Sequence, residues 1–211
     1  MAQDDADFIL QHAERLVKVG TLCVISFGLA EGLNDALQAS ADKDDGDWQQ
    51  AAAGFQDGTL MMAVMRTALL LDRDEKNVSF QTVHRRLKSR AVQIALTDAL
   101  AAKHGDDEFF PPSRAELITT FFDVYSTIDW DVHGRLTHLR NFGVAHLTMK
   151  AMSKSVRFSE LRALVEIVSQ LTGIIQRLCH TQTAFNDRYL EDYRDIARRS
   201  ISKGLPSAVV N

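Results

Sequence analysis

The sequence predicts an all-α fold, an antiparallel bundle of about six helices. Apolar residues recur at steps of three and four along most of the 211-residue chain, which is the period of an amphipathic helix. Only three prolines occur, and alanine and leucine are abundant, so most of the backbone is free to be helical. No segment shows the sustained two-residue alternation that is typical of a half-buried strand.

The first two helices are expected over residues 5–40 and 48–72. The first has an apolar face that includes Leu16, Cys23 and Leu37. The polar stretch 39–47 separates the two helices, and Asp47 is expected to cap the second. Residues 1–72 are thus able to form a helical hairpin packed on the rest of the chain.

Serine residues predict where the next helices begin. Ser79 follows the charged loop 71–77 and is expected to cap a helix that runs to about residue 103. Thr82 stands where a capping box would need Glu or Gln, so this start signal is partial. Ser113 and Glu116 match a capping box after the helix-breaking pair Pro111-Pro112, and they start a helix that runs to about residue 127.

Two further helices, and a continuation of the helix that starts at Ser113, complete the predicted bundle. They are expected over residues 130–151, after an interruption at Asp129-Trp130-Asp131, and over 159–180 and 184–202. Gly204 and Pro206 end the last of them. We therefore expect one domain over residues 1–203, followed by a mobile tail over 204–211.

Composition and charge are those of an ordinary globular protein. Residues 1–57 carry 11 acidic and 3 basic side chains, whereas residues 58–211 carry 17 acidic and 21 basic ones. The resulting net charge of +4 on the body is weak evidence for a polyanionic partner. The acidic N-terminal part is interpreted as a solvated face.

The sequence predicts a cytoplasmic protein without a membrane span. Cys23 and Cys179 lie far apart and fit no disulfide or metal framework, so a reducing compartment is expected. The acidic N-terminus does not look like a signal peptide. The longest apolar run, Leu22 to Ala30, is shorter than the roughly 20 residues that a span needs.

The most informative stretch is Leu139-Arg140-Asn141-Phe142-Gly143-Val144-Ala145-His146-Leu147. It places a cation, an amide and an imidazole in an apolar helical segment, where unpartnered polar groups are costly. On a helix, His146 lies about 120° around from Arg140, so both side chains can border one groove. His138 and His133 lie upstream in the same segment.

These residue types suit metal-independent cleavage of RNA. A histidine such as His146 can exchange a proton with the ribose 2′-hydroxyl or the leaving 5′-oxygen at neutral pH. Arg140 presents a fork of donors that matches phosphate, and Asn141 can orient the histidine or hold a phosphate oxygen. The alternative is structural: Arg140 pairs with Asp123, Asp129 or Asp131, and His146 is a satisfied core histidine.

Other charged groups carry weaker signals. The segment 85–90 could contact phosphates through Arg85, Arg86, Lys88 and Arg90, with His138 as a further candidate. It could equally be a solvated face paired with Asp72, Asp74 and Glu75. His133, His138 and His146 do not share one helical face, and Asp106-Asp107-Glu108 lacks the spacing of a calcium loop. No metal or other cofactor is therefore expected.

The Arg140–His146 string resembles the motif helix of the HEPN superfamily, in which Arg, commonly followed by Asn or Asp, precedes His by a few residues. The nearest branch is the AbiU-like abortive-infection group. That group's leucine-rich turn, charged loop and Ser-initiated helix resemble residues 69–74 and 78–83 here. Gly143 is unusual within the motif helix.

This resemblance implies a HEPN-like bundle, and catalytic members of the superfamily are typically dimers. Carried over, it implies a homodimer in which Arg140, Asn141 and His146 of both chains face one cleft. We accordingly expect an endoribonuclease of a toxin–antitoxin or phage-defence system, with RNA and an antitoxin protein as partners. The alternative is a non-catalytic interaction or nucleotide-binding module in which Arg140 and His146 hold a dimer interface.

Overall fold

The computed structural model describes residues 1–40, 46–105, 112–141 and 155–203. These residues form eight α-helices and no strand, which confirms the all-α prediction and replaces the predicted six helices with eight. The helices are α1 Ala2–Ala39, α2 Gly46–Leu70, α3 Phe80–Leu87, α4 Arg90–His104, α5 Arg114–Ser126, α6 Trp130–Leu139, α7 Phe158–Cys179 and α8 Tyr189–Lys203.

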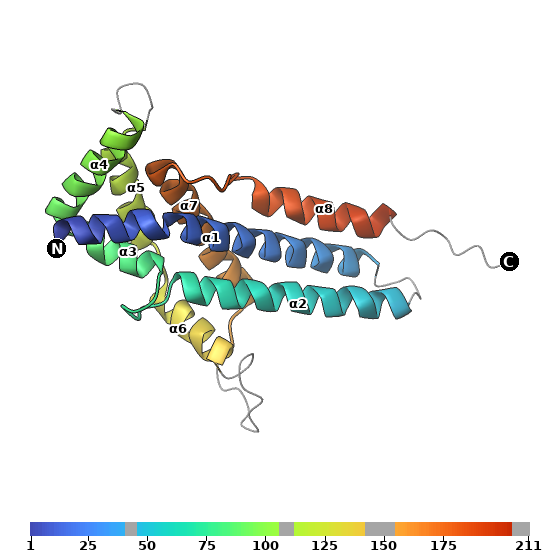
Figure 1. The fold of residues 1–211 in the computed structure, drawn as a ribbon. Helices are drawn as coiled ribbons and strands as arrows, with labels where there is room; N and C mark the ends of the chain where they lie inside the picture. Colours follow the sequence, from blue (N-terminus) through green and yellow to red (C-terminus); the bar gives the residue numbers. More distant parts are fainter. Residues whose placement is uncertain (41–45, 106–111, 142–154, 204–211) are drawn as a thin grey trace.

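Helix α1 is the centre of the fold. It packs against α2, α7 and α8 and, near its N-terminus, against α3 and α4. Figure 1 shows α1, α2 and α8 running side by side, with α3, α4 and α5 near the N-terminal end of α1 and α6 beside the C-terminal end of α2. The predicted hairpin of residues 1–72 is present as the antiparallel pair α1 and α2.

Three glycines let other helices approach the backbone of α1. A Cβ atom on Gly32 would lie 2.1 Å from the carbonyl oxygen of Arg194 in α8, and one on Gly28 would lie 2.6 Å from that of Leu190. On Gly20 it would lie 2.1 Å from the Thr172 hydroxyl of α7. Because no other residue lacks this atom, the crossings of α1 with α7 and α8 require glycine.

The predicted helix over 79–103 is in fact two helices, α3 and α4. Ser89 adopts an extended conformation (φ −78°, ψ 119°) at the N-cap position of α4, without a side-chain capping bond, so the chain turns between Leu87 and Arg90. The Gln93 side chain donates a 2.7 Å hydrogen bond to the carbonyl of Leu87, which that turn leaves without a helical partner. Serine favours such a break because it stabilises helix starts better than helix interiors.

The predicted caps are mostly confirmed. The Ser79 hydroxyl accepts from the Thr82 amide at 3.2 Å, and Ser113 and Glu116 form a full capping box. Asp47 is the exception, because α2 already begins at Gly46 and Asp47 lies in its first turn. There it still favours the helix by opposing the positive end of the helix dipole.

Both cysteines are buried, and they are not bonded to each other. Burial raises the pKa of Cys23 to about 11 and that of Cys179 to about 12, so both stay as thiols at neutral pH.

By length and composition α1 could cross a membrane, but 72% of its apolar window is buried inside the fold. The uninterrupted run from Leu22 to Ala30 had understated how apolar the whole helix is.

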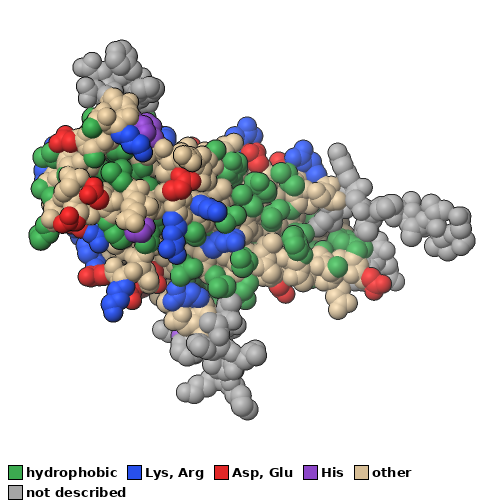
Figure 2. Space-filling view, viewed as in Figure 1, with side chains coloured by type: hydrophobic (Ala, Val, Ile, Leu, Met, Phe, Trp, Pro, Cys, Tyr) green, Lys and Arg blue, Asp and Glu red, His purple; other side chains and the backbone are tan. Residues whose placement is uncertain are grey.

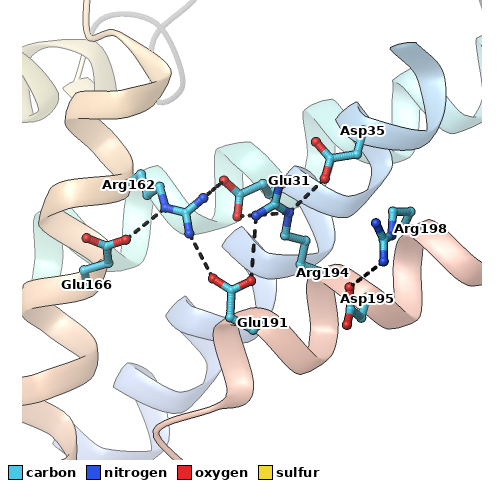
Figure 3. A network of polar contacts seen from close by, with 8 residues as sticks. All are labelled: Glu31, Asp35, Arg162, Glu166, Glu191, Arg194, Asp195 and Arg198. Carbon is cyan, nitrogen blue, oxygen red and sulfur yellow. Dashed lines mark hydrogen bonds and ion pairs between the residues drawn. The ribbon is translucent and has the colours of Figure 1, made fainter. Parts of the chain in front are cut away.

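A network of charges joins α1, α7 and α8 (Figure 3). Its centre is Glu31, whose side chain is 6% exposed and which pairs with Arg162 of α7 and with Arg194 of α8 at 3.7 Å. Burial raises the pKa of Glu31, and the two arginines oppose this rise. Both also contact Glu191 of α8, and Arg162 bonds Glu166 whereas Arg194 bonds Asp35.

We expect Gly32→Ala to destabilise the protein by about 1–3 kcal/mol, because the added methyl group meets the α8 backbone, which cannot rotate away. The matched control is Gly54→Ala, where nothing lies within 4 Å of the added atom. It should leave stability unchanged or raise it by up to about 1 kcal/mol. Urea unfolding measures both variants, and equal effects would contradict the proposed close approach.

We expect Arg162→Met to cost about 2–3 kcal/mol at neutral pH, because it leaves the buried Glu31 carboxylate with one distant partner. Glu31→Gln should cost less, because both arginines keep other carboxylates.

The raised pKa of Glu31 means that its contribution to stability is fully present below pH 4.5 and is lost as pH rises through the raised value. Unfolding measured against pH should therefore lose this decline in Glu31→Gln.

Candidate functional site

The predicted motif begins at the C-terminal end of α6. Asp129 starts this helix by accepting hydrogen bonds of 3.0 Å from the amides of Asp131 and Val132. Val132, His133 and Leu136 are buried, and Arg140 continues the helical backbone (φ −55°, ψ −48°) just beyond Leu139. Arg140 and Asn141 therefore lie together where α6 leaves the core.

Arg140 is bound to its neighbour and to the loop between α2 and α3. Its Nε donates a 3.0 Å hydrogen bond to Oδ1 of Asn141, and its Nη1 lies 3.6 Å from Oδ2 of Asp72. Both side chains of the ion pair are about one-fifth exposed, at 21% for Arg140 and 18% for Asp72. Such a contact holds the guanidinium in place and leaves it accessible from solvent.

The expected structural partners of Arg140 were wrong. Asp72 is the one described carboxylate within ion-pair distance of Arg140, rather than Asp123, Asp129 or Asp131. Asp72 is itself held by the amide of Asp74 at 2.9 Å and by the side chain of Asn77 at 3.2 Å. The loop over residues 71–79 thus presents a fixed carboxylate to the end of α6.

His146 and Gly143 lie outside the described residues, as do residues 142–154 as a whole. That Arg140 and His146 border one groove therefore stays a prediction. Of the three proposed catalytic residues, Arg140 and Asn141 are brought together by the described structure.

His133 belongs to the core rather than to a surface site. Its side chain is buried, and it forms a hydrogen bond with the backbone of Ala68 in α2. Burial lowers the pKa of His133, so the ring is neutral at pH 7. Its Nε2 is buried with no hydrogen-bond partner in the described part of the chain. His138 is only partly buried, so its contact with phosphate stays a prediction.

Sequence reasoning missed Arg73 and Trp130. The guanidinium of Arg73 lies 4.3 Å above the ring of Trp130, which is the first residue of α6. Arg73 and Arg85 both lower the pKa of Tyr125 against the larger effect of burial, which raises it to about 12. Both cations therefore lie near this phenol, and Trp130 lies 5.6 Å from its ring. A charged loop next to a tryptophan was visible in the sequence, but their contact was not.

The side chains of the basic segment 85–90 differ in their contacts, so neither of its two interpretations, phosphate contact or a solvated face with ion pairs, holds for all of them. Arg85 pairs with Glu75, as expected of a solvated face, but Arg86 pairs with Asp5 of α1 and lies 3.9 Å above the Phe8 ring. Arg90 donates a 3.0 Å hydrogen bond to Gln93, and Lys88 is exposed. Arg86 thus holds α3 to α1, and Arg85 and Lys88 remain as candidates for contact with an anion.

Comparisons with models of protein families, with curated proteins and with solved structures find no match. Among the described residues, no group of three His, Cys, Asp or Glu side chains could hold a metal ion.

We expect the protein to lose stability as pH falls from 6.5 to 4 through protonation of His84. Burial, with Lys88 and Arg85 nearby, lowers the pKa of His84 to about 4. The unfolded chain therefore binds more protons in that window, and the contribution is complete only above pH 6.5. The ring is partly exposed, so we expect a loss of about 1–2 kcal/mol, less than the full shift would give.

The matched variant is His84→Phe, which keeps an aromatic ring on Tyr125, 3.7 Å from the His84 ring, and removes the titration. Thermal unfolding followed at several pH values should show a smaller decline in this variant than in the wild type. Parallel profiles would mean that His84 does not carry the effect, because the buried His133 titrates in both proteins.

Proposed function

We propose that the end of α6 and the loop over residues 71–79 form the RNA-binding surface of a metal-independent endoribonuclease of HEPN type. The observation that supports it is the pairing of Arg140 with Asn141 at an accessible helix end, beside a cation stacked on an aromatic ring. Arginine on a phosphate and an aromatic ring near a base are the usual contacts to unpaired RNA.

In this proposal Arg140 and Asn141 hold the scissile phosphate, and His146 transfers the proton. The ribose 2′-oxygen attacks phosphorus and loses its proton, while the bond to the 5′-oxygen breaks and that oxygen gains a proton. The products are a 2′,3′-cyclic phosphate and a 5′-hydroxyl end. The guanidinium stabilises the negative charge that grows on the phosphoryl oxygens, and no metal ion takes part.

Asp72 would compete with the RNA phosphate for Arg140. At 3.6 Å the ion pair lacks a direct hydrogen bond, so a phosphate can replace it with two charge-assisted ones. Without RNA, the carboxylate keeps the arginine oriented. Asp72 therefore sets both the position of Arg140 and the affinity that a phosphate needs to displace it.

The biological setting is proposed from the resemblance alone. The chain would act as the toxin of a toxin–antitoxin or phage-defence system in the cytoplasm, neutralised by an antitoxin protein. Two copies would place their Arg140, Asn141 and His146 residues in one cleft across a two-fold axis.

A second candidate function is a non-catalytic interaction module. The ion pair between Arg140 and Asp72 favours it, because this contact joins the end of α6 to the loop after α2. It would stabilise the fold without a catalytic role. In that case the arginine would contribute to stability or assembly and not to a reaction.

The decisive experiment incubates single-stranded RNA with the protein in excess chelator and identifies the product ends. We expect cyclic phosphate ends from the wild type, and none from RNA whose 2′-oxygens are methylated. Arg140→Ala should slow cleavage by about 10²–10³-fold and His146→Ala by about 10²–10⁴-fold. Asp72→Asn should bind the methylated RNA up to about tenfold more tightly, because the competing charge is gone.

The control is Arg188→Ala, which removes an arginine whose side chain is 81% exposed. Arg188 is far from α6 in the sequence, so this variant should leave cleavage unchanged. Identical products from the wild type and His146→Ala would refute the nuclease. A lower melting temperature for Arg140→Ala in a protein that never cuts RNA would favour the interaction module.

A further inference from the structure

Helix α2 carries an apolar stripe on the side that faces away from α1. Residues of α2 that are buried against the core cluster on one side of the helix, at Ala63, Val64, Thr67, Ala68 and Leu70. Roughly 160° around the helix from their centre lies a second set at alternating steps of three and four. We name this set the α2 seam; it comprises Trp48, Ala51, Phe55, Gly58, Met62, Met65 and Leu69.

The α2 seam has the spacing of a coiled-coil interface but no partner helix in the described structure. Its residues repeat every seven positions over three heptads. One repeat position holds large side chains, namely Trp48, Phe55, Met62 and Leu69, and the other holds Ala51, Gly58 and Met65. Phe55 is 59% exposed, Leu69 46% and Met62 43%. Exposed apolar side chains at one repeat position are unusual on a helix that faces only water.

The described surroundings leave room for a close neighbour. A Cβ atom added to Gly58 would meet nothing within 4 Å, and the same holds for Gly54 one turn away. No charged residue belongs to the seam. Figure 2 shows hydrophobic side chains at the surface of the end where α1, α2 and α8 run together. The only charged residues in α2 are Asp47, Asp57 and Arg66, a composition that does not favour an anionic membrane surface.

We infer that the α2 seam is the interface for a second copy of this chain, with the two α2 helices antiparallel. The reason is self-complementarity. The two-fold axis crosses the pair at the level of residue 60 along each helix. Met62 of each copy then faces the partner's Gly58, and Leu69 faces the partner's Ala51. Phe55 then faces the partner's flexible Met65. Three of the four large seam residues thus meet small or adaptable ones, as knobs-into-holes packing requires, whereas Trp48 lies opposite residue 72, beyond the end of the partner's α2. A two-fold axis makes every contact occur twice.

This dimer would keep the two Arg140 sites apart. Asp72, which contacts Arg140, lies 12 residues beyond Leu60, or about 18 Å along a helix. In the antiparallel pair the two Asp72 residues are therefore separated by roughly 35 Å. The seam is thus a different surface from the composite cleft that the resemblance implies, and the inference does not depend on the proposed nuclease.

Sedimentation velocity on the full chain over a range of concentrations tests the inference. We expect the wild type to form dimers. Phe55→Glu should raise the dimer dissociation constant by at least about tenfold, because it buries a charge in an apolar interface. The matched control Ile94→Glu, at an apolar side chain on α4 that is 49% exposed, should leave the constant unchanged.

The register has its own test in Phe55→Glu combined with Met65→Lys. These positions are too far apart to meet within one helix, but the inferred register places each opposite the other in the partner. The double variant should regain at least part of the lost dimer. A wild type that stays monomeric up to its solubility limit would overturn the inference, as would equal weakening by Phe55→Glu and Ile94→Glu. Circular dichroism confirms that each variant is folded.

Discussion

The need to cover α1 governs the architecture of this protein. Its buried residues lie on one face from Ala6 to Gly20 and on nearly every side from Thr21 to Ala36, so several other helices must pack around it. Apolar burial on this scale is the main favourable term in folding. The glycines at positions 20, 28 and 32 set how closely α7 and α8 can approach. Helix α6 packs on α2 and α7, so its candidate site is positioned through these two partners of α1.

The charge network around Glu31 adds orientation to that packing. Apolar contacts are non-directional and tolerate sliding of one helix along another. An ion pair with Arg162 of α7 and another with Arg194 of α8 fix where each helix stands along α1. The cost is a carboxylate whose pKa is raised by burial, since its charged form loses water that the two arginines only partly replace.

The periodicity of the sequence predicted nearly all of the helices, because each buries one recognisable face. It missed the break at Ser89, where the backbone becomes extended although the helical pattern continues on both sides. It placed Arg140 within a helix over residues 130–151, whereas α6 ends at Leu139, and it did not find the ion-pair partner of Arg140. Asp129 and Asp131 are close in sequence, whereas Asp72 is close only because α2 ends beside α6. Nor could spacing show that His133 faces the core, since that depends on where α2 lies.

The order of the helices along the chain has a consequence for synthesis. Helix α1 ends at Ala39, whereas α7 begins at Phe158 and α8 at Tyr189, so two of its three main partners emerge more than a hundred residues later. Until then α2 can cover only part of it. A helix apolar enough to cross a membrane is thus exposed on the growing chain. Completion of the fold waits for the last helices, so part of the apolar surface of α1 stays uncovered while the chain grows.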